Sequence, residues 1–310
     1  MIEVQGLSRY YGRHRAVDGL DFSIDSNQVV GFLGLNGAGK TTTLKVLAGV
    51  LMPTAGTVKI DGHDLNDAPI ALRSQIGFLP ETPPLHADMR VRDFLEYVAE
   101  LRGMSAEATK ARLGIVAEQT EITDVLDRVV STLSHGYRKR VGIAQAILHQ
   151  PKLVILDEPI SGLDPAQIVE MRQIISGLAQ DCTVLLSSHI LAEVSQTCDR
   201  ILVLSEGRIV ADGTEAELSA RVQGGAGIRL TVRGTTESVS ATLDDNESVE
   251  KWNVEATNGD VLTLGVTLTG DHREAVVKAL SDAGLGIRSL SGDDSELETV
   301  FLDLTRVEAT

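Results

Sequence analysis

This chain contains few cysteines and few aromatic residues, and it has fewer basic than acidic residues. The 310 residues include two cysteines, Cys182 and Cys198, whose spacing fits neither a disulfide framework nor a metal motif. We therefore expect two reduced thiols in a cytosolic chain. The 44 Asp and Glu residues outnumber the 28 Lys and Arg residues, which gives a net charge of −16. Such an acidic chain is a poor candidate for sequence-independent nucleic-acid binding, because that binding depends on neutralising phosphates.

Long hydrophobic runs are also missing. No run approaches the roughly 18 apolar residues that suggest a membrane span. The N-terminal residues MIEVQGLSRYYG lack the basic and then apolar pattern of a secretory signal. We therefore expect no direct membrane insertion, so any action at a membrane would run through a partner. The apolar fraction of 43% and the charged fraction of 23% are ordinary for a globular protein and exclude wholesale disorder.

Charge and glycine content divide the chain near residue 222. Residues 221–310 carry 8 basic and 16 acidic residues, so this short stretch has a net charge of −8, equal to that of residues 1–220. The glycine-rich residues 224–227 are typical of a linker. We predict one domain at residues 1–222, a linker at 223–227 and an accessory C-terminal domain at 228–310.

The two parts differ in hydrophobic pattern. In the N-terminal part, short apolar runs alternate with helical stretches, which predicts an α/β fold with a buried parallel sheet. Those runs are Gln28–Leu33, Leu153–Leu156, Thr183–Leu186 and Ile201–Leu204. In the C-terminal part, apolar residues alternate at 228–232 and at 262–268, which is typical of antiparallel strands. The predicted order is strand, short helix, strand, strand, helix, strand and a final helix around 297–304, a small ferredoxin-like α+β domain.

The strongest single motif is a phosphate-binding loop. Residues Gly34–Thr41 read GLNGAGKT and fit the pattern G-x-x-x-x-G-K-[ST], between an apolar strand and a predicted helix at Thr42–Val50. The glycines let backbone N–H groups turn towards phosphate oxygens, and the helix N-terminus adds partial positive charge. Lys40 is predicted to reach the β- and γ-phosphates, and the Thr41 hydroxyl to ligate Mg²⁺. A glycine-rich turn without a ligand is the alternative, and Lys-Thr in register argues against it.

Two further segments become informative when they are considered together with this loop. Asp157 and Glu158 follow the apolar run Leu153–Leu156, at the strand edge where open α/β sheets bind ligands. Asp157 can hold a water of the Mg²⁺ shell, and Glu158 can polarise an attacking water. Alone, such a pair is common surface chemistry. Between the two motifs lies LSHGYRKR, in which Ser134 is a candidate helix cap and Gly136 permits close approach of another group.

In this order the motifs resemble those of the ATP-binding subunit of an ABC transporter, over about residues 1–220. The resemblance implies a P-loop nucleotide-binding domain with a RecA-like core and a helical subdomain at about residues 82–150. It implies that Tyr11 stacks on adenine, that Lys40, Glu158 and His189 are catalytic, and that Asp164 belongs to the D-loop. The implied nucleotide-binding positions are Tyr11, Gly34, Asn36, Gly37, Ala38, Gly39, Lys40, Thr41 and Thr42.

Weaker members of the set have ordinary structural alternatives. Tyr11 could be a packed aromatic residue, and Tyr10 competes for its role. His189 alone would more often be a structural histidine. Asp164 could simply cap a helix that begins near Pro165.

Two segments depart from the usual family pattern. Glu81 stands where the family has a glutamine; an ionised carboxylate can still bind Mg²⁺ or water but cannot donate a hydrogen bond. The signature reads LSHGY rather than LSGGQ, with His135 and Tyr137 as the changes. These features and the segment LETVFL near the C-terminus resemble ATPases of ABC-2-type exporters, most closely gliding-motility-type ATP-binding proteins. A subunit of a copper or nitrous-oxide-reductase maturation exporter is the alternative.

The resemblance also implies a mechanism. Two ATP molecules with Mg²⁺ would lie between two such domains, in a homodimer or with a paralogous ATPase subunit. Ser134 and Gly136 would act in trans on the partner's nucleotide, and the metal-binding positions would be Thr41, Asp157 and Glu81. A groove around Glu81–Met89 would receive a helix of an ABC-2-type membrane permease, with Glu81 as the coupling residue. The chain would then lie at the inner face of the cytoplasmic membrane.

Two other classes of function compete with this interpretation. A soluble ABC ATPase acting on DNA or ribosomes usually has two nucleotide domains or a long coiled-coil insertion, and this acidic chain has neither. A non-hydrolytic regulatory module would explain Glu81, His135 and Tyr137 as degeneration. Intact Lys40 and Glu158 argue against it.

Overall fold

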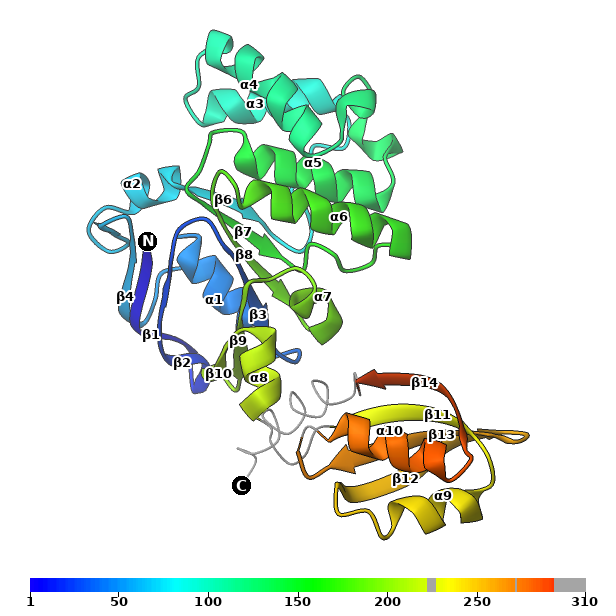
Figure 1. The fold of residues 1–310 in the computed structure, drawn as a ribbon. Coiled ribbons are helices and arrows are strands. Elements are labelled where there is room, and N and C mark those ends of the chain that lie inside the picture. Colours follow the sequence, from blue (N-terminus) through cyan, green and yellow to red (C-terminus); the bar gives the residue numbers. More distant parts are fainter. Residues whose placement is uncertain (222–226, 271, 293–310) are drawn as a thin grey trace. The chain divides into compact units, whose positions relative to one another are not determined.

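The computed structural model describes residues 1–221, 227–270 and 272–292 (Figure 1). These residues form two compact units, one at Met1–Glu215 and one that begins at Ala216. The helix α8 (Glu215–Arg221) lies at this division. Gly227, which was predicted to end the linker, is already the first residue of a strand. The final helix predicted around 297–304 lies outside the described residues.

A six-stranded sheet forms the centre of the first unit. Its strand order is β10-β9-β3-β8-β7-β6; all neighbours are parallel except the edge pair β10 and β9. The predicted buried strands are confirmed, with ends shifted by one or two residues, and every residue of β3, β7 and β8 is buried. The strands are β10 (Arg208–Gly213), β9 (Arg200–Ser205), β3 (Val29–Leu33), β8 (Thr183–Ser188), β7 (Leu153–Asp157) and β6 (Ile76–Leu79).

An antiparallel sheet, which was not predicted, completes the core of this unit. Its order is β2-β1-β4-β5, formed by β1 (Ile2–Tyr11), β2 (His14–Ile24), β4 (Ala55–Ile60) and β5 (His63–Asp64). Register shifts along β1 break the alternation of apolar residues, which hides these strands from a period-two search.

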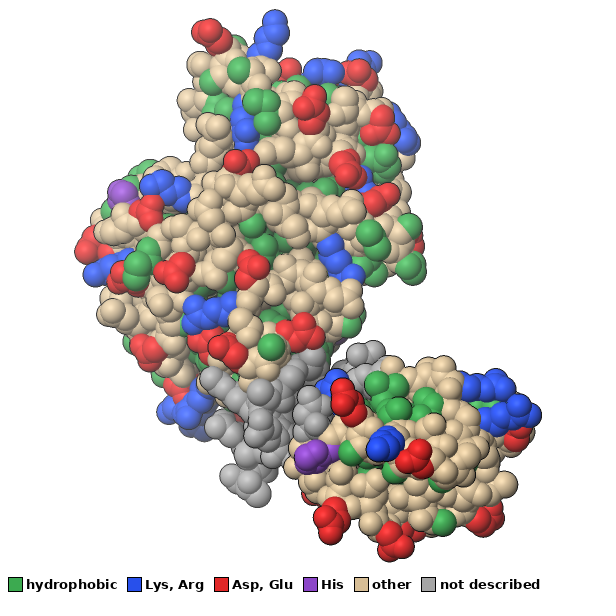
Figure 2. Space-filling model, in the orientation of Figure 1, with side chains coloured by type: hydrophobic (Ala, Val, Ile, Leu, Met, Phe, Trp, Pro, Cys, Tyr) green, Lys and Arg blue, Asp and Glu red, His purple; other side chains and the backbone are tan. Residues whose placement is uncertain are grey.

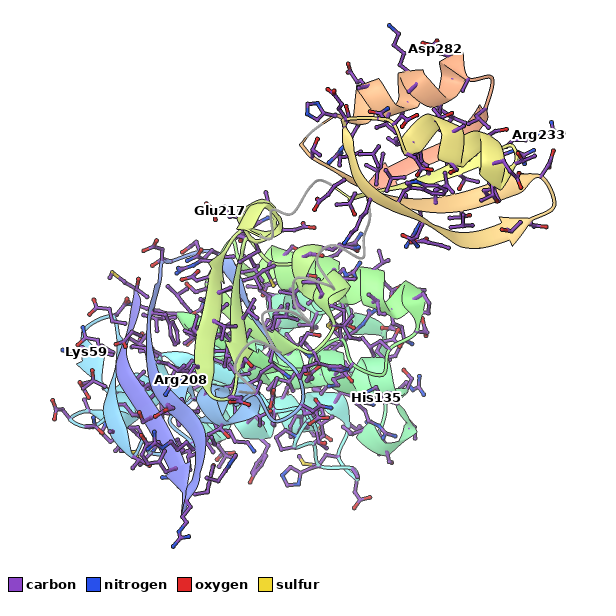
Figure 3. The ribbon with its side chains drawn as sticks, turned by 90° about the horizontal axis from the view of Figure 1, so that it is seen from below. Lys59, His135, Arg208, Glu217, Arg233 and Asp282 are labelled. Carbon is purple, nitrogen blue, oxygen red and sulfur yellow. The ribbon has the colours of Figure 1, made fainter. Side chains whose placement is uncertain are left out.

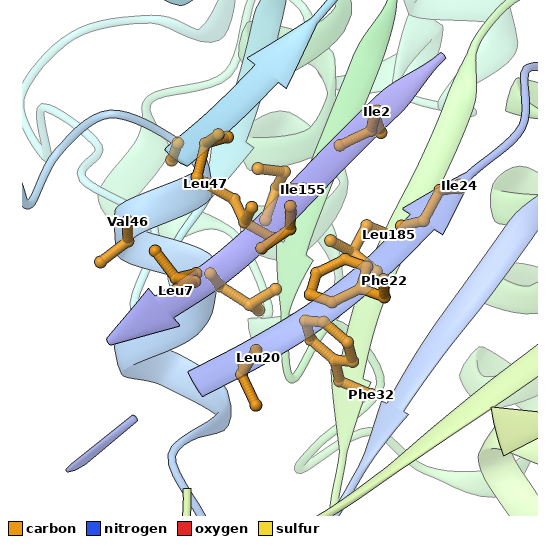
Figure 4. Close-up of a cluster of buried hydrophobic side chains, with 14 of the residues drawn as sticks. Ile2, Leu7, Leu20, Phe22, Ile24, Phe32, Val46, Leu47, Ile155 and Leu185 are labelled. Carbon is orange, nitrogen blue, oxygen red and sulfur yellow. The ribbon is translucent and has the colours of Figure 1, made fainter. Parts of the chain in front are cut away.

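The helix α1 (Lys40–Leu47) packs against both sheets in one hydrophobic cluster (Figure 4). Val46 and Leu47 share that cluster with Leu7 of the antiparallel sheet and Leu185 of the six-stranded sheet. Phe22 and Phe32 meet edge to face across the two sheets, with ring centroids 5.5 Å apart. The prediction of this helix at Thr42–Val50 was wrong at both ends. Gly39 takes the N-cap position in a left-handed conformation, so the helix begins at Lys40.

Helices connect the strands of the first unit and pack against the six-stranded sheet. The segment after β6 contains α3 (Val91–Leu101), α4 (Ala106–Gln119) and α5 (His135–Ile147), with two short 3₁₀ turns, Thr123–Val125 and Val130–Thr132. The helix α5 contacts β6 and β7, while α6 (Pro165–Leu178) contacts β8. Two shorter helices are α2 (Pro69–Ser74) and α7 (Leu191–Ser195). Among the described residues, no helix has the length and apolar character needed to cross a membrane.

The second unit has one antiparallel sheet with two helices. Its elements in chain order are β11 (Gly227–Arg233), α9 (Thr236–Leu243), β12 (Val249–Asn258), β13 (Val261–Leu268), α10 (Arg273–Asp282) and β14 (Gly286–Gly292). The spatial order is β12-β13-β11-β14. Ile228, Leu230 and Val232 are buried in a core shared with both helices, as their alternation predicts. The ferredoxin-like assignment stays a prediction.

Phe32 tests the core between the two sheets of the first unit. The Phe32→Ala variant is expected to lose about 3–5 kcal/mol of unfolding free energy, because it removes a fully buried ring and leaves a cavity. Urea unfolding followed by far-UV circular dichroism measures this loss. The matched control is Val50→Ala at a 65% exposed position, for which a change below about 0.5 kcal/mol is expected. A loss under about 1 kcal/mol in Phe32→Ala would contradict the packing described here.

Candidate nucleotide-binding site

The phosphate-loop residues 34–39 connect β3 to α1 and depend on glycine at two points. Gly39 has φ +101°, and a Cβ there would lie 2.4 Å from the carbonyl oxygen of Ala16. A Cβ on Gly34 would lie 2.7 Å from the carbonyl oxygen of Leu204. Only glycine fits at these two positions, because backbone atoms of distant strands occupy the space.

A pocket of about 340 Å³ lies in front of this loop. It brings together most of the predicted site: Tyr11, Asn36, Gly37, Gly39, Lys40, Thr41, Thr42, Glu81, Glu158 and His189. The lining also includes Leu35 of the loop motif and Ser161, which opens the segment that resembles a D-loop, together with His14 and Ala16, which no sequence motif marks. The remaining predicted positions are not in its lining: Gly34, Ala38, Asp157, Ser134, Gly136 and Asp164.

Lys40 is buried at the pocket floor. Its ammonium group donates hydrogen bonds to the carbonyl oxygens of Gly34 (2.7 Å) and Leu35 (3.3 Å) and lies 3.7 Å from Glu158 Oε1. Burial lowers the pKa of Lys40, and the nearby charges of Glu158 and Asp157 oppose that shift. The loop therefore holds a buried positive charge beside the pocket, where it can attract an anion.

Asp157 is almost fully buried behind the pocket at the end of β7. Its Oδ1 accepts hydrogen bonds from Thr41 Oγ1 (3.2 Å) and Ser187 Oγ (2.7 Å). Its Oδ2 is buried without a hydrogen-bond partner among the described residues. An unpartnered carboxylate oxygen beside a threonine hydroxyl suits the water shell of Mg²⁺, which retains several waters and prefers few protein ligands. The described residues contain no cluster of His, Cys, Asp and Glu that could hold a metal alone.

Glu158 follows directly and has an unusual backbone. Its φ of +50° lies in the left-handed region, which is costly for a residue with a Cβ. Its N–H donates to Ser187 Oγ at 3.0 Å. Its carboxylate lies between two partners, with Oε1 3.7 Å from Lys40 Nζ and Oε2 3.0 Å from His189 Nδ1. His189 is therefore a pocket residue that contacts the predicted base, rather than a core histidine.

Two residues that contact Asp157 or Glu158 were not identified from the sequence: Ser187 and Lys139. Ser187 pairs with Asp157 in the parallel register of β7 and β8, so an aligned pair of strand ends would have indicated it. Lys139 lies on α5 and is 1% exposed. Within the run Arg138–Arg140 it looks like part of a solvated basic face, and no sequence signal marks it as buried.

The two neighbouring tyrosines have different surroundings. Tyr11 lines the pocket and is 48% exposed, and the guanidinium of Arg9 lies 4.9 Å from its ring centroid. The Tyr10 hydroxyl instead donates to Asp18 Oδ1 at 3.0 Å. Tyr11 is thus the tyrosine of this pair that the pocket includes.

The signature segment forms the start of α5, away from the pocket of its own chain. Ser134 is the N-cap, and its hydroxyl accepts a hydrogen bond from the N–H of Tyr137, as predicted for a cap. A Cβ on Gly136 would lie 2.7 Å from Gln167 Oε1, so its close approach is to α6. His135 lies at the start of α5, on the opposite side of the first unit from Lys59 (Figure 3), and its Nε2 is 3.4 Å from the carbonyl oxygen of Ser161.

Asp164 caps the helix α6. Its Oδ1 accepts a hydrogen bond from the N–H of Gln167 at 3.0 Å, and Pro165 is the first residue of the helix. The capping alternative is therefore observed, and the D-loop role stays a prediction.

Comparisons with known proteins place this geometry in a family. The ABC transporter family model matches residues 17–161. The daunorubicin/doxorubicin resistance ATP-binding protein DrrA of Streptomyces peucetius is 34% identical over 98% of this chain and 92% of its own. The chain belongs to the ABC transporter ATP-binding proteins. The bacitracin transport ATP-binding protein BcrA of Bacillus licheniformis is 37% identical over 68% of this chain and 69% of its own.

Solved structures agree with this assignment for the first unit. A structure of the ATP-binding subunit of an ABC transporter has a TM-score of 0.64 and 33% identity, covering 71% of this chain and 92% of that one. A nucleotide-free ATP-binding cassette has a TM-score of 0.65 and 27% identity, covering 71% and 94%. The predicted ABC nucleotide-binding fold is confirmed. These matches leave the C-terminal unit untested.

As an ABC transporter ATP-binding protein, the chain is an ATPase coupled to transport. Two of the relatives it resembles are named for daunorubicin resistance and for bacitracin transport. Subunits of this family bind ATP and act within transporters. The likeness to gliding-motility-type proteins stays a prediction. The copper or nitrous-oxide alternative gains no support over this assignment.

Tyr11 tests the assignment of the base-binding position. In Tyr11→Ala we expect ATP binding to weaken about tenfold, because base–aromatic stacking is worth about 1–3 kcal/mol. Tyr10→Phe removes only a hydroxyl outside the pocket lining and is expected to leave the dissociation constant unchanged. Isothermal titration calorimetry with Mg·ATP compares the two variants. The assignment is wrong if Tyr11→Ala binds ATP like the unmodified protein.

Proposed function

We propose that this chain is the ATPase subunit of an ABC-2-type exporter, which hydrolyses Mg·ATP between two nucleotide-binding domains to drive a separate permease. The observation that carries the proposal is the position of the Glu158 carboxylate. It lies between Lys40 and His189 at the edge of the phosphate-loop pocket. A buried carboxylate so placed can accept a proton from a water that attacks the γ-phosphate.

Each remaining residue has a role that follows from its contacts. Lys40 and the loop N–H groups bind the phosphates, and His189 orients the Glu158 carboxylate through its 3.0 Å contact. Mg²⁺, when bound, neutralises charge on the phosphate oxygens, and Thr41 with Asp157 would hold it. Glu81 lines the same pocket and is a further candidate for contact with Mg²⁺ or its waters.

A second chain completes the site in this proposal. The chain has one phosphate loop and one signature segment, and neither Ser134 nor Gly136 lines the pocket of its own chain. We therefore place these two residues against the nucleotide of a partner, either a second copy or a paralogous ATPase. Splitting the site makes hydrolysis conditional on closure, which can switch a permease between two states.

The permease is proposed to contact the surface next to Glu81–Met89. Leu101 (68% exposed) and Tyr97 (40% exposed) on α3 are large apolar side chains at the surface, and Ile70 on α2 is 81% exposed. Arg102 connects α3 to α2 through a hydrogen bond to the carbonyl oxygen of Arg73. Exposed apolar side chains on two connected helices suit an amphipathic helix of a permease at the inner membrane face.

The competing functions are less well supported. Acidic and basic side chains are interspersed on the face shown in Figure 2, and the net charge is −16, which disfavours DNA or ribosomes as partners. The Glu158 carboxylate contacts both Lys40 and His189, and Ser187 links Glu158 to Asp157, which disfavours a non-hydrolytic module. The transported substrate would be set by the permease, including any link to gliding motility.

Glu158→Gln tests the two-chain mechanism. This variant keeps the shape of the side chain but removes the proton acceptor, so it is expected to bind Mg·ATP, to lose hydrolysis and to accumulate as a dimer. Size-exclusion chromatography with and without Mg·ATP measures the dimer, and an ATPase assay of the unmodified protein runs in parallel. A monomer under both conditions, together with no turnover in the unmodified protein, would contradict a self-sufficient homodimer. Co-purification with a permease and a paralogous ATPase would then test the heterodimer.

Asp157→Asn tests the metal position. Removing the charge of this carboxylate is expected to raise the Mg²⁺ concentration for half-maximal hydrolysis about 10–100-fold, as for other residues that orient a metal. ATP binding in the presence of EDTA is expected to change little. Asp61→Asn serves as the control, because Asp61 pairs with Lys152 and the N-terminus outside the pocket. Equal Mg²⁺ requirements in both variants would count against Asp157 as the metal-holding residue.

A further inference from the structure

Lys139 on α5 joins three segments of the first unit through one ammonium group. Its Nζ donates hydrogen bonds to the carbonyl oxygens of Glu81 and Glu158, each at 2.8 Å. The side chain is 1% exposed, so water cannot replace either bond. The three segments are the pocket loop containing Glu81, the turn after β7 and the helix that begins at the signature.

The contact with Glu158 acts on the strained residue. The positive φ of Glu158 persists only where neighbours hold it on both sides. On one side its N–H donates to Ser187 Oγ, and on the other its carbonyl oxygen accepts from Lys139. Together these two bonds fix the peptide planes that aim the carboxylate at His189.

The charges around Lys139 also favour an ammonium group at this place. Burial lowers the pKa of Lys139, while the charges of Glu81, Glu158 and Asp157 favour its protonated form. Lys40 lies on the carboxylate side of Glu158, and Lys139 lies on its carbonyl side. A protonated amine supplies the donors needed for two carbonyl oxygens, whereas a leucine or methionine would leave both oxygens buried without partners.

We propose that Lys139 is a positioning residue for hydrolysis: it holds the backbones of Glu158 and Glu81 to the signature helix, so that the catalytic carboxylate follows any movement of α5. Lys139 does not line the nucleotide pocket, so its effect falls on turnover and not on nucleotide affinity. The part of this inference that concerns turnover rests on the proposed function.

Two substitutions distinguish the effect of the hydrogen-bond donors of Lys139 from the effect of its side-chain volume. Lys139→Met removes every donor and is expected to lower kcat about 10–100-fold, since small displacements of a catalytic group have effects of this size. Lys139→Gln keeps amide donors on a shorter side chain that reaches one carbonyl oxygen. Its kcat is therefore expected to lie between that of the unmodified protein and that of Lys139→Met. The dissociation constant for Mg·ATP is expected to stay within about twofold in both variants. Lys110→Met on the exposed face of α4 is the matched control.

Hydrogen exchange provides a readout that does not depend on turnover. Mass spectrometry of the nucleotide-free variants is expected to show faster amide exchange in segments 80–85 and 156–162 of Lys139→Met, with α5 and β6 unchanged. General destabilisation would instead raise exchange throughout α5. Unchanged exchange in both segments would overturn the inference whether or not the chain hydrolyses ATP.

The kinetic outcome can also overturn it. A folded Lys139→Met variant with kcat within about twofold of the unmodified protein is incompatible with a positioning role. So is a loss of kcat that is matched by a loss of nucleotide binding. Should the methionine variant fail to fold, Lys139→Gln decides: an unchanged kcat refutes the proposal, and a lowered kcat with unchanged nucleotide affinity supports it.

Discussion

Two carboxylates at the end of one buried strand lie where water hardly reaches them. Asp157 is 1% exposed and Glu158 is 8% exposed. Two buried lysines offset the cost of this burial: Lys40 lies 3.7 Å from the Glu158 carboxylate, and Lys139 donates a hydrogen bond to the Glu158 carbonyl oxygen. Each cation belongs to a different element, one at the start of α1 and one within α5. The interactions of these two lysines therefore connect α1 and α5 to the end of β7.

The parallel sheet makes this arrangement possible. Parallel neighbours bring the ends of β3, β7 and β8 to the same edge, so the loop, the acid pair and Ser187 meet there without long connections. The antiparallel sheet contributes Tyr11, the last residue of β1, and Ala16, near the start of β2. The candidate nucleotide-binding site thus lies where the two sheets, which have different hydrophobic patterns, pack around α1.

The sequence predicted what is local and missed what is long-range. The loop Gly34–Thr41, the strand before Asp157 and the cap at Ser134 follow from spacing within a few residues. The start of α1 was misplaced because it depends on the left-handed Gly39. Lys139 was missed because it is buried where α5 packs against the segments that contain Glu81 and Glu158. The periodicity of a short basic run does not predict such contacts between distant segments. The antiparallel sheet was missed because bulges along β1 break its period.

The crowding around Gly34 and Gly39 has a consequence for the order of assembly during synthesis. The walls behind these glycines are carbonyl groups of Ala16 and Leu204, and the N–H of Gly207 donates to the Ala38 carbonyl oxygen. The loop is therefore shaped partly by strands that leave the ribosome long after it. A nascent chain that ends before β9 contains the whole motif and Ala16 but lacks the Leu204 carbonyl group and the Gly207 N–H. The full set of contacts that shape the loop is therefore present only after β9 and Gly207 have been synthesised.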